Sequence, residues 1–66
     1  MTSKVNGFLC GVFFAMQYLA LNRGEPTAAK ELALENSMTK KWALAESRRT
    51  GYRVREMNKF IREELP

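Results

Sequence analysis

Asn22-Arg23-Gly24-Glu25-Pro26 is the stretch that decides the fold of this 66-residue chain. It follows a long apolar segment, residues 8–21, and precedes a more polar one. Gly24 suits the left-handed conformation that ends many helices, and Pro26 suits the first turn of the next helix. Such a short connection makes the two flanking helices neighbours in space. The sequence therefore predicts a helical hairpin at this junction.

Helical periodicity extends over the rest of the chain. The predicted helices cover about residues 3–22, 26–50 and 52–64, and a break of the second helix near residues 36–38 is left open. In the last helix Val54, Met57 and Ile61 fall on one face. We expect a single all-α domain over residues 1–66, a three-helix arrangement made of a helical hairpin plus a C-terminal helix.

The first predicted helix carries more apolar surface than two short helices can cover. One apolar stripe follows the usual helical spacing, and a second stripe lies on the opposite side. Either this is the central core helix of a monomer, or its surplus surface binds a second copy or another protein. Because aromatic anchors carry most of the energy of many interfaces, the candidate protein-interface residues are Phe8, Phe13, Phe14, Tyr18 and Leu21.

Positive charge is concentrated in the C-terminal part of the chain. Residues 1–38 hold equal numbers of basic and acidic residues, whereas residues 39–66 hold eight basic against four acidic residues and account for the whole formal charge of +4. This asymmetry favours an anionic partner. The alternative is a solvated cationic face that keeps an apolar protein in solution.

The chain lacks the side chains that most enzymes and metal sites require. It has no histidine, the commonest general base, and Cys10 is its single cysteine. Neither an internal disulfide nor a tetrahedral zinc site can form from this set. Cys10 lies in an apolar segment, as expected of an inert thiol. We expect a non-enzymatic protein with no cofactor, no metal and no small-molecule substrate.

A membrane partner is not expected. Residues 8–21 are apolar over fourteen residues, which is short of the ~20 that a transmembrane helix requires. The free cysteine and the lack of an obvious signal peptide favour a cytoplasmic protein.

Residues 28–42 resemble part of the helix-turn-helix of bacterial repressors. The positions that match its first helix and turn are Ala29, Leu32, Ala33 and Leu34. The positions that match its second helix are Thr39, Lys40, Lys41 and Trp42. In that motif a small turn residue lets two helices cross closely, and a basic second helix enters the major groove. Ala33 stands where glycine is usual, and Thr39 stands where an apolar residue is expected.

DNA binding is therefore the alternative function. Lys41, Arg48 and Arg55 are spaced by sevens and would share a face if the helix continued through Gly51. Together with their neighbours they could neutralise several phosphates. The candidate nucleic-acid-binding residues are Lys40, Lys41, Arg48, Arg49, Arg53 and Arg55.

The chain as a whole resembles the small early accessory proteins of lambdoid bacteriophages. The resemblance lies in the aromatic helix 8–18, the junction 22–27 and the arginine-rich end. It implies a short, helical, non-catalytic regulator in the host cell cytoplasm. We expect a regulatory or adaptor protein that acts through its apolar helix and its basic C-terminal face. Its expected partner is a host or phage protein, a second copy of itself in a homodimer, or both.

Overall fold

All of the regular secondary structure in the described residues is helical. The computed structural model describes the backbone of residues 3–66 and the side chains from residue 7 onward. Helix α1 (Ser3–Gln17) continues into a π-helical turn, η1 (Tyr18–Asn22). The remaining helices are α2 (Pro26–Glu35), α3 (Lys40–Thr50) and α4 (Val54–Glu64). The predicted all-α class is confirmed. The predicted number of three helices is wrong, because the segment 26–50 forms two helices.

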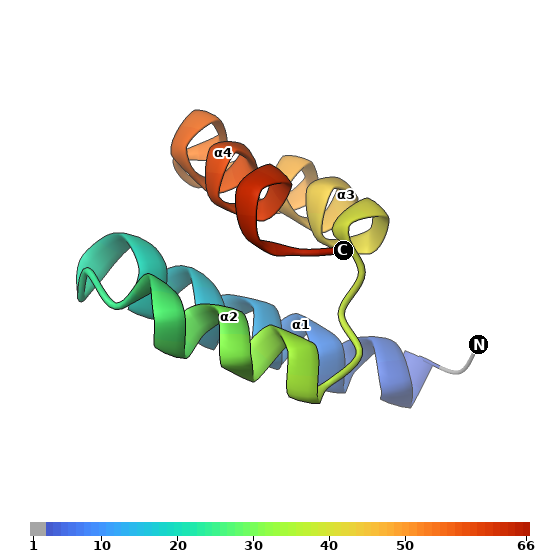
Figure 1. The fold of residues 1–66 in the computed structure, drawn as a ribbon. Coiled ribbons are helices and arrows are strands. Elements are labelled where there is room, and N and C mark those ends of the chain that lie inside the picture. Colours follow the sequence, from blue (N-terminus) through green and yellow to red (C-terminus); the bar gives the residue numbers. More distant parts are fainter. Residues whose placement is uncertain (1–2) are drawn as a thin grey trace.

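The four helices are arranged as two hairpins. Helices α1 and α2 run antiparallel along one layer, and α3 and α4 lie over them as a second antiparallel pair (Figure 1). The core lies between the layers and takes residues from all four helices. Its buried apolar members are Phe13, Met16, Ala29, Ala33, Met38, Ala43, Met57, Phe60, Ile61 and Leu65.

The composition of this core suits closely packed helices. Ala29 and Ala33 on α2 and Ala43 on α3 are fully buried, so small side chains stand where the helices pack. The spaces that remain are filled largely by methionine, whose flexible side chain adapts to irregular gaps.

The first hairpin turns as its sequence predicts. Gly24 has the left-handed φ of 62°, and Pro26 begins α2. The first two carbonyl groups of η1 accept hydrogen bonds from the turn: Arg23 N–H donates to Tyr18 O at 3.1 Å, and Glu25 N–H donates to Leu19 O at 2.8 Å. The turn therefore satisfies backbone groups that a helix end would otherwise leave unpaired.

The connection between α2 and α3 answers the question that the sequence left open. Ser37 adopts a left-handed φ of 57°, and Met38 N–H donates to Ala33 O at 3.0 Å, which closes the end of α2. Thr39 then caps α3, because its Oγ1 accepts a hydrogen bond from Trp42 N–H at 3.2 Å. The break also directs the Met38 side chain into the core.

Replacing Ser37 with glycine should stabilise the fold. Ser37 is held in a conformation that glycine adopts without strain, so Ser37→Gly is expected to raise the free energy of unfolding by about 1 kcal/mol. Chemical denaturation followed by circular dichroism measures this change. The control Ser37→Ala keeps a Cβ atom in the same strained backbone and should give no gain. Equal effects of the two substitutions would contradict the explanation.

Candidate protein-binding cleft

Helix α1 and the start of η1 have a side that the residues described by the structure leave uncovered. Phe8 is 63% exposed, Phe14 67% and Tyr18 47%, as expected of interface residues. Phe13 instead lies in the core with 1% of its surface exposed. Leu21 is half-buried and packs against the same core. Phe13 and Leu21 therefore contribute to the core, and their role at an interface stays a prediction.

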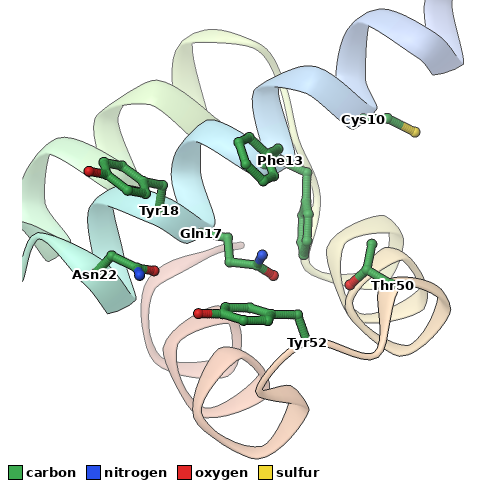
Figure 2. Close-up of a pocket in the computed structure, with 8 residues that line it drawn as sticks. Cys10, Phe13, Gln17, Tyr18, Asn22, Thr50 and Tyr52 are labelled. Carbon is green, nitrogen blue, oxygen red and sulfur yellow. The ribbon is translucent and has the colours of Figure 1, made fainter.

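The uncovered side of α1 borders a cleft of about 410 Å³. One wall comes from α1 and η1, and the other comes from the segment that joins α3 to α4 (Figure 2). None of the lining side chains bears a full charge in its ordinary neutral-pH form. We call this site the aromatic cleft, and its lining residues are Cys10, Phe13, Phe14, Gln17, Tyr18, Asn22, Thr50 and Tyr52.

The turn between α3 and α4 positions Tyr52 in the aromatic cleft. Gly51 ends α3 with a left-handed φ of 71°, and Arg53, just before α4, has a left-handed φ of 44°. Two left-handed residues thus flank Tyr52 and reverse the chain within a few residues. Figure 2 shows the Tyr52 ring opposite α1, with the side-chain amide of Gln17 extending toward it.

Arginine side chains reach α1 and η1 from the second hairpin. Arg49 binds the nearly buried Glu46 through two hydrogen bonds, Nε to Oε1 at 2.8 Å and Nη2 to Oε2 at 2.6 Å. The same Nη2 lies 3.9 Å from Cys10 Sγ. Arg53 Nη1 donates to the backbone oxygen of Leu21 at 3.5 Å. Cys10 and Asn22, which follows Leu21, both line the aromatic cleft. The Arg49 guanidinium therefore lies near the cleft at Cys10, and the Arg53 guanidinium lies near it at Asn22.

The contacts between Cys10, Glu46 and Arg49 shift the titration of all three groups. Hydrogen bonding to Glu46, helped by partial burial, raises the pKa of the Cys10 thiol above its ordinary value. The hydrogen bonds from Arg49 lower the pKa of Glu46, and Glu46 in turn raises the pKa of Arg49. Cys10 is therefore a protonated thiol at neutral pH, and thiolate chemistry is disfavoured at this position.

Removing the charge of Glu46 should make Cys10 more reactive. The neutral amide introduced by Glu46→Gln no longer opposes formation of the thiolate, so this substitution should lower the Cys10 pKa and speed alkylation by iodoacetamide near neutral pH. The measurement is the alkylation rate from neutral to alkaline pH, compared with Glu63→Gln, which removes an exposed carboxylate on α4. Identical pH profiles in all three proteins would contradict the role given to Glu46.

The basic residues predicted to bind nucleic acid lie on two helices, α3 and α4, and on the turn between them. Helix α3 ends at Thr50, so Arg55 lies on α4. The seven-residue spacing of Lys41, Arg48 and Arg55 therefore does not place Arg55 on the same helix face as the other two. Lys41, Arg48 and Arg55 are exposed and Lys40 is half-buried. Arg49 pairs with Glu46, and Arg53 lies 3.6 Å from Glu56.

The turn that the helix-turn-helix resemblance places at Ala33 lies further along the chain. Ala33 lies inside α2 and is fully buried, whereas the chain turns after Glu35. Thr39 lies outside α3 as its cap, and Trp42 packs edge-on against Phe13 at a ring-centroid distance of 6.2 Å. Helices α2 and α3 pack mainly against α1 and α4 rather than against each other.

Sequence reasoning missed the polar residue at the centre of the site. Gln17 is 6% exposed, and its Oε1 has no hydrogen-bond partner among the described residues. The signal was present, because Gln17 is the one amide side chain within the apolar segment 8–21. Tyr52 was missed as well, because nothing local in the sequence reveals that it faces α1 across the cleft.

Within the part of the chain that the structure describes, no helix combines the length and hydropathy needed to cross a membrane. No group of three or more metal-ligating side chains gathers among these same residues. Comparison of the chain with protein-family models, with curated proteins and with solved structures found no match.

Proposed function

We propose that this chain is a non-enzymatic regulatory or adaptor protein that binds an acidic amphipathic segment of another protein in its aromatic cleft. The observation that carries the proposal is the exposed aromatic side of α1 beside an uncharged cleft that arginines approach from the second hairpin. The phage-type role and the cytoplasmic location remain predictions from the sequence.

The apolar part of the proposal rests on the cost of leaving aromatic rings in water. Phe14 and Tyr18 are both well exposed, and both line the cleft. Burying apolar surface contributes roughly 25 cal/mol per Å², and aromatic side chains are common anchors of protein interfaces. A partner that inserts an apolar side chain into the cleft would cover both rings at once.

The charge of the chain favours an acidic partner over a neutral one. No carboxylate lines the aromatic cleft, and Glu46, near Cys10, is nearly buried against Arg49. Arg48 is exposed, and it forms no ion pair with any residue that the structure describes. Acidic residues beside an apolar anchor would be attracted by the net charge of +4 that the chain carries, which raises association rates and favours the correct partner.

DNA binding through Lys40 and Lys41 is the weaker proposal. Both lysines lie at the start of α3, where helices of this kind can enter a groove. The two helices lack the mutual packing of a helix-turn-helix, however.

Synthetic helical peptides test the proposed partner chemistry. Three labelled peptides share one tryptophan-containing apolar face and carry glutamate, glutamine or lysine on the polar face. Fluorescence anisotropy should rank their affinities as acidic, then neutral, then basic, and added salt should narrow the difference. Phe14→Ser should weaken the acidic peptide more than about tenfold, as expected for an interface anchor.

Leu34→Ser is the matched control, since Leu34 is an exposed apolar residue of α2 outside the cleft, and it should leave binding unchanged. Equal affinities for the three peptides, or no binding, would overturn the proposal. A concentration-dependent dimer that Phe14→Ser dissociates would instead assign the cleft to a second copy. Salt-sensitive binding of duplex DNA that survives Phe14→Ser but is lost in Lys40→Glu with Lys41→Glu would favour DNA.

A further inference from the structure

The side-chain amide of Gln17 is an unusual group to find in an apolar cleft. Only 6% of the surface of Gln17 is exposed, and its Oε1 receives no hydrogen bond from any described residue. An acceptor buried without a partner is destabilising, because it has lost its water and gained nothing in return. Folding alone gives no reason for a glutamine here, whereas a ligand that supplies a donor does.

Two other buried oxygens also lack partners, and neither lies at the cleft. Ser47 Oγ belongs to a fully buried hydroxyl within α3. Asn58 Oδ1 lies on α4. Gln17 alone among the three lines the aromatic cleft. Oε1 is itself enclosed by protein, so rotation about the last side-chain bond of Gln17 has to turn it toward a ligand in the cleft.

The surroundings of Gln17 restrict what that ligand can be. Phe14, Tyr18 and Tyr52 supply aromatic walls, and Figure 2 shows the Gln17 amide between α1 and the Tyr52 ring. Aromatic walls favour a flat, apolar group, and the unpaired oxygen requires a hydrogen-bond donor. Among side chains, tryptophan joins a large apolar ring to an N–H that donates and accepts nothing. Phenylalanine lacks the donor, and a charged side chain would lose its hydration in this lining.

The tryptophan has to come from a different protein. The one tryptophan of this chain, Trp42, is half-buried and packs edge-on against Phe13. A second copy therefore has no free indole to offer without opening its own core.

We infer that the aromatic cleft is a tryptophan-binding site and that Gln17 is its specificity-determining residue. The indole ring of an acidic partner lies against Tyr18 and Tyr52, and its N–H donates to Gln17 Oε1. The inference rests on the proposed function, since the tryptophan belongs to the acidic partner segment described above.

The hydrogen bond can be measured with two small probes of nearly the same shape. Indole carries the N–H, and benzothiophene replaces it with sulfur. Both are titrated into the ¹⁵N-labelled full chain, and dissociation constants are taken from the amide shifts of residues around the cleft. The same titrations use Gln17→Met, which keeps the length of the side chain without its acceptor. The ratio of the benzothiophene constant to the indole constant should be about fivefold larger in the wild type than in Gln17→Met.

The ratio cancels the different hydrophobicity of the two probes and any general loosening of the variant. Equal ratios in the two proteins, or shifts confined to residues away from the cleft, would overturn the inference. If Gln17→Met does not fold, wild-type protein is titrated with the acidic peptide that carries tryptophan, phenylalanine or benzothienylalanine. Weaker binding of both replacements supports the hydrogen bond, and equal binding of all three overturns it.

The two proposals fail in different ways. In the first case, the acidic peptides with tryptophan, phenylalanine and benzothienylalanine bind equally well, and all of them bind better than the basic peptide. This outcome leaves the adaptor function standing and removes tryptophan specificity. The other outcome is a ratio of dissociation constants that is larger in the wild type than in Gln17→Met, without any preference for an acidic peptide. This outcome removes the acidic partner and leaves the indole site.

Discussion

The contact between Phe13 and Trp42 fixes how the two hairpins of this chain lie on each other. Phe13 comes from α1 and Trp42 from α3, and their rings meet edge-on at an angle of 73°. Such a contact adds a directional preference to the burial of two large apolar side chains. It also orients α1, because the side of the helix that turns toward α3 is set by Phe13. The adjacent Phe14 is then left on the outer side, where it borders the aromatic cleft.

Much of the backbone course could be predicted because its signals are local. Gly24 marks the first turn because glycine adopts a positive φ without strain, and Pro26 marks it because proline has a fixed φ. Gly51 ends α3 in the same way as Gly24 ends the first hairpin helix. The break at Ser37 could not be decided, because serine seldom adopts a positive φ. There the outcome depends on burying Met38 and on the cap that Thr39 provides, and only the folded chain brings these together.

The candidate site was less predictable, because its residues are defined by contacts between distant segments. A helix that is apolar nearly all round does not reveal whether Phe13 or Phe14 faces the core. The pairing of Arg49 with Glu46 follows i,i+3 spacing, yet its contact with Cys10 depends on the crossing of α1 and α3. Charge counted along the sequence treated Arg49 and Arg53 as phosphate-binding or solvated cations, whereas in the fold they connect the two hairpins.

The π-helical turn η1 has a consequence for how this chain can change in length. Hydrogen bonds in such a turn span five residues instead of four, so it is equivalent to an α-helix that has gained one residue. Everything before the turn is thereby rotated by about 100° relative to the chain that follows. Deleting one residue between 18 and 22 would undo that rotation and turn part of the buried side of α1 toward solvent.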